Sequence, residues 1–289
     1  MTLKLFNDPV ILRPIRMIVL DIDGTLMDST DHIRPRVRDS VREAMDSGCL
    51  VTLATGRRLV GARQVAADLG VALPLILQNG SLVQDSVTEA VIFQSPLEPE
   101  TVEAVVDEIV RHGRQPIVVE SPAFGGRLYS GDPTRDNDPT RRYDRLRGPY
   151  VRVDDDDLRA IRHVLSISTL DVEGGLADLA VVVARIPGTY PLRSMWRMFD
   201  YEALEVFRAG CSKASAIEQV AAAHNITMDE VMAIGDGLND LEMLAAVGLG
   251  VAMGNAEPAA RAAARVQVRT NDEDGVAEAI DRFLFGRNS

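Results

Sequence analysis

The pattern of apolar and polar residues starts with four consecutive apolar residues, Met17 to Leu20, which run directly into Asp21 and Asp23. A short apolar run bounded by turn residues predicts a strand that is buried on both faces, as parallel sheets require. Gly24 predicts a turn directly after it. With a side-chain period near two, we expect both carboxylates to point into the crevice at the end of this strand.

Strands and helices alternate through the first eighty residues. Helical spacing of apolar residues and buried apolar runs predict a helix, a strand, a helix and a strand over residues 35–47, 50–54, 59–69 and 74–78. This alternation is typical of a doubly wound parallel sheet with right-handed crossovers. The predicted fold class is therefore α/β, with a Rossmann-like core.

The alternation changes after Gly80, where residues 82–93 alternate like a half-exposed strand. Residues 123–148 are rich in Gly, Pro, Asp and Arg and predict a loop or a weak hairpin. The remaining pattern predicts helices over 99–112 and 176–184, a capped turn over 154–157, and strands over 116–120, 161–168, 193–198 and 204–207. We interpret this region as an inserted α+β domain.

Doubly wound alternation returns from Lys213 onward. Helices are predicted over 213–224, 241–247, 258–264 and 275–285, and strands over 231–234, 248–253 and 265–268. The predicted domains are a core of residues 1–81 and 208–289, in which 1–15 is an N-terminal extension, and an inserted cap of residues 82–207.

Composition narrows the range of partners. A net charge of -12 and a pI near 4.9 argue against a surface for nucleic acid or anionic membranes. Cys49 and Cys211 lack metal-type spacing, and no apolar run is long enough to span a bilayer. We expect a cytoplasmic protein that binds a small molecule; the sequence does not specify an oligomeric state.

Polar clusters fall at or near the carboxyl ends of the predicted strands, which share one edge of a parallel sheet. These clusters are Asp21 with Asp23, Thr55, Lys213, and Asp236 with Asn239 and Asp240. Carboxylates suit a hard cation such as Mg²⁺. A hydroxyl, an ammonium and an amide facing that cation suit a phosphate, whose anionic oxygens need donors and positive charge.

The chain resembles the haloacid dehalogenase superfamily phosphatases, in particular the Cof-like branch with a type IIB cap. The resemblance extends from about Arg16 to Phe285. It is carried by Asp21-Ile-Asp-Gly-Thr, Ala54-Thr-Gly-Arg57, Asn79-Gly80, Lys213, Gly235-Asp-Gly-Leu-Asn-Asp240, Met253-Gly-Asn-Ala256 and Thr270-Asn-Asp-Glu-Asp-Gly275.

The resemblance implies hydrolysis of phosphate esters through an aspartyl-phosphate. Asp21 would be the nucleophile, and Asp23 would protonate the leaving oxygen and then activate water. Mg²⁺ would be held by Asp21, Asp236 and the backbone carbonyl of Asp23. The implied phosphate-binding residues are Gly24, Thr55, Gly56, Lys213 and Asn239, with Asp240 behind them orienting Lys213 or a metal-bound water.

Several residues have more ordinary interpretations. A single aspartate or threonine at a strand end is usually a cap or turn residue, and Asn79-Gly80 also fits a hinge turn. Asn255 and residues 272–274 fit loop stabilisation better than catalysis. Candidate substrate contacts are Arg57, Asn79, Arg127 and Arg142, where the two cap arginines lie in a locally basic region that also fits a solvated loop.

The predicted substrate is a small phosphorylated metabolite, such as a sugar phosphate or a phosphorylated cofactor precursor. Two other enzymatic functions remain alternatives: a phosphomutase, and a dedicated sugar-phosphate phosphatase of the sucrose- or mannosylglycerate-forming type. A non-catalytic binding module on the same fold is the alternative from another class, although such modules usually lack one of the carboxylates or the lysine.

Overall fold

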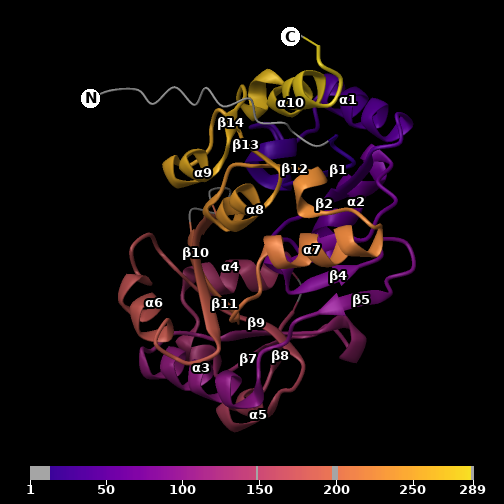
Figure 1. The fold of residues 1–289 in the computed structure, drawn as a ribbon. Coiled ribbons are helices and arrows are strands. Elements are labelled where there is room, and N and C mark those ends of the chain that lie inside the picture. Colours follow the sequence, from indigo (N-terminus) through magenta and orange to yellow (C-terminus); the bar gives the residue numbers. More distant parts are fainter. Residues whose placement is uncertain (1–13, 148, 197–200, 288–289) are drawn as a thin grey trace. The chain divides into compact units, whose positions relative to one another are not determined.

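A computed structural model describes residues 14–147, 149–196 and 201–287 (Figure 1). Most of the predicted extension, residues 1–13, therefore lies outside the described residues. The described residues form two compact units: one comprises the described parts of Met1–Thr52, Leu69–Val71 and Glu218–Ser289, and the other comprises those of Leu53–Asp68 and Ala72–Ile217. The predicted boundaries between core and cap stay a prediction.

The first unit is built on a sheet with the strand order β14-β13-β12-β1-β2. Pairing is parallel between β1 and β12, between β12 and β13, and between β13 and β14. The strands are β1 (Met17–Leu20), β2 (Leu50–Leu53), β12 (Val231–Gly235), β13 (Leu249–Ala252) and β14 (Val266–Gln267). All four residues of β1 are completely buried, as its uninterrupted apolar run predicts.

Helices flank this sheet. They are α1 (Pro35–Asp46), α8 (Leu241–Ala246), α9 (Pro258–Ala263) and α10 (Gly275–Phe283), and α7 (Lys213–Ala223) begins in the second unit and ends in the first. α1 packs against α10, and α8 packs against α9 (Figure 1). α1 stops where predicted, because Gly48 adopts a φ of +90° just beyond it.

The second unit contains an antiparallel sheet of β3 (Leu75–Leu77), β4 (Leu82–Gln84) and β5 (Val91–Gln94). The prediction of one continuous strand over 82–93 was wrong. Asp85 Oδ1 accepts hydrogen bonds from the backbone N–H groups of Val87 (2.9 Å) and Thr88 (2.7 Å), which closes a turn between β4 and β5. These bonds also lower the pKa of Asp85.

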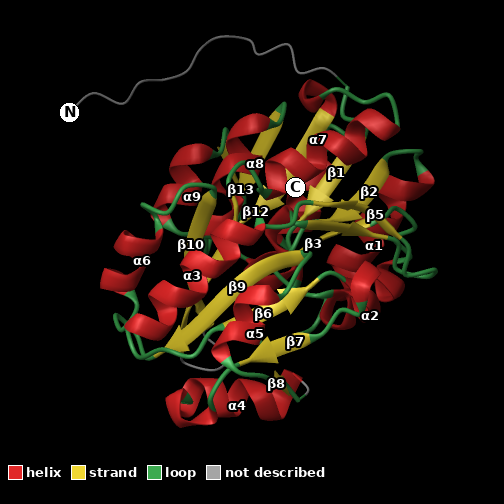
Figure 2. Ribbon diagram, turned by 90° about the horizontal axis from the view of Figure 1, so that it is seen from below, coloured by secondary structure: helices red, strands yellow, loops and turns green. Residues whose placement is uncertain are grey.

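The larger sheet of this unit has the order β10-β11-β9-β6-β7-β8, and β9, β6 and β7 are seen side by side in Figure 2. Its strands are β6 (Ile117–Glu120), β7 (Leu128–Ser130), β8 (Val151–Arg152), β9 (Val164–Asp171), β10 (Thr189–Trp196) and β11 (Tyr201–Arg208). The strand predicted over 193–198 thus corresponds to β10, and residues 197 and 198 lie outside the described residues.

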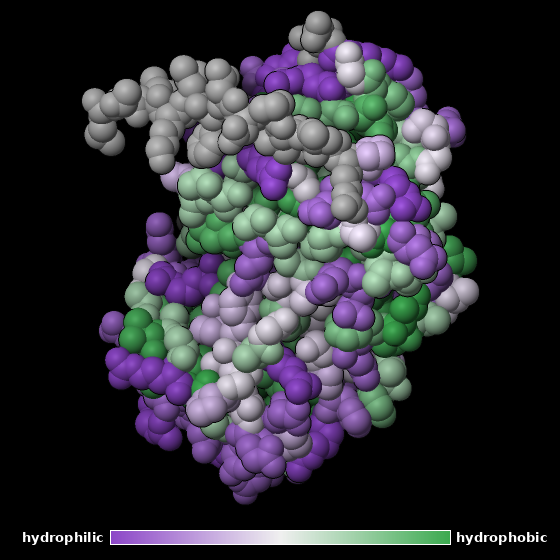
Figure 3. Space-filling view, in the orientation of Figure 1, coloured by the Kyte–Doolittle hydropathy of each residue, from purple (hydrophilic) through white to green (hydrophobic). Residues whose placement is uncertain are grey.

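Helices cover one face of this larger sheet. Side chains of α3 (Pro99–Arg111), α5 (Asp155–Ala160) and α6 (Ala177–Val183) form one apolar core with Val118, Ile167, Leu204 and Val206 of the strands. Among the described residues of this core, none comes from the helix α2 (Leu59–Leu69), which lies in the chain between β2 and β3. The outer surface around α5 is hydrophilic, in agreement with its acidic first turn (Figure 3).

The prediction of a loop or weak hairpin over 123–148 was wrong in its second half, which forms α4 (Asp138–Arg147). Asn137 caps this helix, because its Oδ1 accepts hydrogen bonds from the backbone N–H (2.9 Å) and the hydroxyl (2.7 Å) of Thr140. Thr140 is completely buried, and Tyr143 packs against the sheet. The helix is therefore held by the hydroxyl of Thr140 and the ring of Tyr143. A search for apolar residues at helical spacing does not detect such contacts.

The α/β class and the doubly wound parallel sheet predicted from the sequence are confirmed. Along the described part of the chain, every helix is too short or too polar to cross a membrane.

Candidate active site

Two neighbouring strands of the first unit deliver carboxylates to the same edge of their sheet. β1 and β12 run parallel with Leu20 opposite Ile234, so Asp21 follows the end of one strand as Asp236 follows the end of the other. The backbone N–H of Asp21 donates to the carbonyl of Ile234 at 3.0 Å. One carboxylate oxygen from each of Asp21, Asp236 and Asp240 lies within 4.8 Å of the others.

The turn after β1 wraps around the Asp236 carboxylate. Thr25 Oγ1 donates a hydrogen bond of 2.9 Å to Asp236 Oδ1. Gly24 adopts a φ of +76°, and a Cβ at this position would lie 2.3 Å from Asp236 Oδ2. Only a glycine allows both the left-handed backbone and this close approach.

Asp240 holds the turn that carries Asp236. Asp240 is completely buried, and its Oδ2 accepts hydrogen bonds from the backbone N–H groups of Asp236 (2.9 Å) and Gly237 (2.8 Å). A Cβ on Gly235 would lie 2.5 Å from the same oxygen. The carboxylate of Asp240 thereby orients the Asp236 backbone from close range.

Two asparagines brace the loop that follows Asp23. Asn255 Nδ2 donates to the carbonyl of Gly24 at 2.8 Å, and Asn255 Oδ1 accepts from the backbone N–H of Asn271 at 3.0 Å. Asn271 Nδ2 donates to the carbonyl of Met27 at 2.8 Å, and Asp272 Oδ1 accepts from the backbone N–H of Ser29. These bonds confirm the loop-stabilising interpretation of both motifs.

The donor set of the acidic cluster fits a hard divalent cation. Asp21 is 4% exposed and Asp240 is completely buried, so two of the three carboxylates are withdrawn from water. Buried like charges at this separation repel each other and are costly unless a cation joins them. Oxygen ligands are those that Mg²⁺ and Ca²⁺ prefer. Asp23, by contrast, is exposed.

In the second unit, the residues after β2 contact the turn after β3. Thr55 is completely buried, its backbone N–H donates to Ile76, and its carbonyl accepts from the N–H of Asn79 at 3.0 Å. Its Oγ1 accepts a hydrogen bond of 3.1 Å from the N–H of Arg57, which leaves the hydroxyl proton able to donate elsewhere. Gly56 packs against the Asn79 amide, which would lie 3.2 Å from a Cβ there.

Gly80 allows the start of α7 to approach the same turn. With a φ of +99°, a Cβ on Gly80 would lie 2.1 Å from the carbonyl oxygen of Ser212 and 2.9 Å from the backbone nitrogen of Lys213. Lys213 is 1% exposed. Gly80 therefore lets the backbone at Lys213 lie against the turn after β3, a contact between distant parts of the chain that sequence reasoning missed.

The candidate arginines have different surroundings. Arg57 Nη1 donates to the carbonyl of Gly61 at 2.9 Å. Arg127 donates to the hydroxyl of Tyr129 at 3.4 Å, which is the main reason that its pKa is raised. Arg142, on α4, lies 5.6 Å above the ring of Tyr201. Other members of the predicted basic region form ion pairs, namely Arg135 with Asp155 and Arg152 with Asp136.

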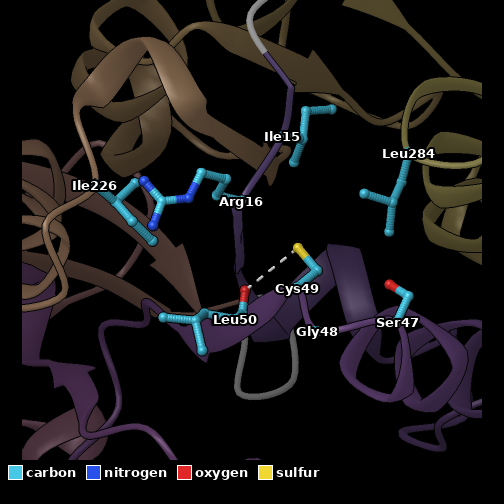
Figure 4. Close-up of a pocket in the computed structure, with 8 residues that line it drawn as sticks. All are labelled: Ile15, Arg16, Ser47, Gly48, Cys49, Leu50, Ile226 and Leu284. Atoms are coloured by element: carbon cyan, nitrogen blue, oxygen red, sulfur yellow. Dashed lines mark hydrogen bonds between the residues drawn. The ribbon is translucent and has the colours of Figure 1, made fainter.

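A pocket of about 430 Å³ lies at the opposite edge of the parallel sheet, beside Arg16 and Leu50 at the starts of β1 and β2 (Figure 4). Cys49 Sγ lines it and donates to the carbonyl of Leu50 at 3.7 Å. Burial raises the pKa of the Cys49 thiol to about 11. At neutral pH this thiol is therefore protonated. Because it lies at the opposite edge of the sheet, the pocket is separate from the acidic cluster.

The family model for haloacid dehalogenase-like hydrolases matches residues 18–280, which include every carboxylate, amide and lysine of the candidate site. The chain belongs to this family. The resemblance predicted from the motifs is thus confirmed.

Two relatives by sequence and one solved structure are similar to this haloacid dehalogenase-like hydrolase over most of its length. It is 31% identical to the 5-amino-6-(5-phospho-D-ribitylamino)uracil phosphatase YcsE of Bacillus subtilis over 94% of this chain and 96% of the relative. It is 28% identical to an HMP-PP phosphatase of Serratia proteamaculans, over 84% and 85% of the two chains. The solved structure of the subclass IIB sugar phosphatase BT4131 shares the fold, with a TM-score of 0.76, 24% identity and coverage of 93% and 98%.

Proposed function

We propose that this hydrolase is a Mg²⁺-dependent phosphatase that cleaves the monoester of a small phosphorylated metabolite through a phosphoryl group carried on Asp21. The observation that carries the proposal is the convergence of the Asp21, Asp236 and Asp240 carboxylates at one sheet edge. A nucleophilic carboxylate in such a cluster needs a cation to offset its neighbours, and phosphoryl transfer needs a cation to offset the phosphate.

The reaction divides into two steps. In the first, an Asp21 carboxylate oxygen bonds to phosphorus, the bond from phosphorus to the ester oxygen breaks, and the carboxylic acid of Asp23 donates its proton to the departing oxygen. In the second, the Asp23 carboxylate takes a proton from water, whose oxygen attacks phosphorus and releases inorganic phosphate from Asp21. The exposure of Asp23 supports this role, because its proton has to reach both the leaving group and water.

Donors for the phosphoryl oxygens would come from the Thr55 hydroxyl, the Lys213 ammonium and the Asn239 amide, together with the backbone at Gly24 and Gly56. Thr55 supports the assignment because its hydroxyl accepts from Arg57 and keeps a proton to donate. When bound at Asp21, Asp236 and the Asp23 carbonyl, Mg²⁺ would supply positive charge to a phosphoryl oxygen. Asp240 would keep Asp236 in place.

The proposed substrates are phosphate esters of cytosolic metabolites, either sugar phosphates or cofactor precursors. Relatives named for a ribitylaminouracil phosphate and for HMP-PP support this class. We propose that the inserted domain selects the leaving group, and that Arg57, Asn79, Arg127 or Arg142 contributes to that selection.

Hydrolysis of 4-nitrophenyl phosphate by the purified protein tests the proposal. Activity should require Mg²⁺ and should disappear on chelation by EDTA and return on adding excess Mg²⁺. Asp21→Asn should abolish turnover and Asp23→Asn should slow it severely, whereas Asp39→Asn, at an exposed position on α1, serves as the matched control. An Asp21→Asn enzyme as active as the control would refute the assignment.

A further inference from the structure

Glu205 on β11 is a carboxyl group that the proposed mechanism does not use. It is only partly exposed, and among the described residues neither a hydrogen bond nor an ion pair reaches its side chain. Desolvation alone raises its pKa to about 7. A carboxyl held in such surroundings without a partner is unfavourable for folding, and unpaired groups of this kind concentrate at functional sites.

The neighbours of Glu205 in the sheet are buried. Its pairing partners are Leu192 on β10 and Ser168 on β9, and both are at most 8% exposed. Because side chains alternate along a strand, Ala203 and Phe207 lie on the same face as Glu205. Leu204 and Val206 point to the opposite face, where the core with α3, α5 and α6 lies. Glu205 is thus on the face that those helices leave open.

The contacts of two other side chains on this face, Tyr201 and Phe207, locate Glu205 along β11. Tyr201, about 13 Å away along the strand, lies beneath Arg142 of α4. Phe207, about 7 Å away in the other direction, packs against Cys211, which stands two residues before Lys213. The carboxyl therefore lies between α4 and the start of α7.

We propose that Glu205 is a specificity-determining residue, which accepts a hydrogen bond from an N–H or O–H group on the leaving group of the substrate. The inference rests on the proposed phosphatase function, in which Lys213 holds the phosphate end. A substrate anchored there and extending along β11 passes Glu205 before it reaches Arg142. The substrate class is then a phosphate ester with a hydrogen-bond donor several atoms from phosphorus.

The chemistry favours a donor over an apolar group at this position. An ionised carboxylate has only acceptor sites, and it is stabilised by an ammonium, an amine N–H or a hydroxyl. An ester without a donor would leave the carboxyl unpaired after water is displaced, which a binding site disfavours strongly. Glu205 would therefore reject donor-free leaving groups as well as attract donors.

Three esters built on the same hexyl chain test the proposal: hexyl phosphate, which has no donor on the chain, and hydroxyhexyl phosphate and aminohexyl phosphate, which carry a donor at the chain end. The measured quantity is the ratio of kcat/KM for each donor ester to that for hexyl phosphate. Glu205→Leu should lower at least one ratio about tenfold, as expected for a lost charged hydrogen bond. Glu173→Gln, at an exposed position in the same unit, should leave both ratios unchanged.

The two donor esters and a second variant separate the outcomes. A loss confined to aminohexyl phosphate identifies an ammonium as the partner, and a loss confined to hydroxyhexyl phosphate identifies a hydroxyl. Glu205→Gln keeps the shape and should lower the ammonium ratio more than the hydroxyl ratio, so the test holds even where Glu205→Leu fails to fold. Unchanged ratios in both variants would overturn the proposal. Failure of the wild-type protein to hydrolyse any ester would instead overturn the phosphatase function.

Discussion

Replacing Gly24 with alanine should disable the acidic cluster far more than it destabilises the protein. The added Cβ would lie 2.3 Å from Asp236 Oδ2, whereas ordinary van der Waals contact begins at 3.4 Å. The Asp236 carboxylate must therefore retreat by about 1 Å, which disrupts its 2.9 Å hydrogen bond from Thr25. A displacement of this size in a catalytic group costs on the order of 100-fold in rate.

Gly48 provides a matched control for the backbone. It also has a positive φ, of +90°, but a Cβ there meets nothing within 4 Å. Either substitution forces alanine into a left-handed conformation, which costs about 1–2 kcal/mol of folding free energy. Urea unfolding of both variants measures that shared cost, and kcat/KM for 4-nitrophenyl phosphate across a Mg²⁺ titration measures the additional effect at Gly24.

We expect both variants to lose a similar amount of unfolding free energy. Gly24→Ala alone should also lose activity on the order of 100-fold and should need a higher Mg²⁺ concentration to reach half of its maximal activity. Equal activity in Gly24→Ala and Gly48→Ala would show that the Asp236 carboxylate is not held against Gly24, or that its position does not matter for turnover.

Three further predictions concern other parts of the chain. Gly80→Ala should push the start of α7 away and reduce kcat/KM for 4-nitrophenyl phosphate. The control is Gly113→Ala, which also has a positive φ but whose Cβ meets nothing within 4 Å. Equal activities of the two variants would contradict the close approach of Ser212 to Gly80. If Arg127 or Arg142 binds a second anionic group, its replacement by alanine should raise KM for the physiological substrate more than for a small generic ester, and equal effects on both esters would exclude that role. Because burial raises the pKa of Cys49 to about 11, its alkylation by iodoacetamide should be slow at pH 8 and accelerate as the pH approaches 11, and a fast reaction at pH 8 would contradict its burial.

The strands and the residues at their ends could be predicted because both depend on local pattern. The apolar run from Met17 to Leu20 is buried throughout, and the carboxylates after it meet those after β12 because parallel strands end at one edge. The clustering of Asp240 with Asp21 and Asp236 follows from the turn that Asp240 itself closes.

Other features depend on contacts that no local pattern encodes. The helix α4 is held by the Asn137 cap, the buried Thr140 and the ring of Tyr143, so a search for apolar spacing missed it. The approach of Ser212 to Gly80 joins segments far apart in sequence. Glu205 drew no attention in the sequence, because only the pairing of β11 with β9 and β10 reveals its buried neighbours.

The proposed mechanism is tested most directly by locating the phosphoryl group on the protein during turnover. The Asp23→Asn variant, in which the proposed second step lacks its base, would be mixed with Mg²⁺ and 4-nitrophenyl phosphate, whose 4-nitrophenolate leaves without needing a proton from Asp23. The mixture would be quenched in acid, digested with pepsin at acid pH, where an acyl phosphate survives longer than at the alkaline pH of trypsin, and analysed by tandem mass spectrometry. One added phosphoryl group is expected on the peptide that contains Asp21, with fragment ions that assign it to Asp21. A protein that releases 4-nitrophenolate but carries no phosphoryl group there, or carries it on another residue, would refute the proposed aspartyl-phosphate.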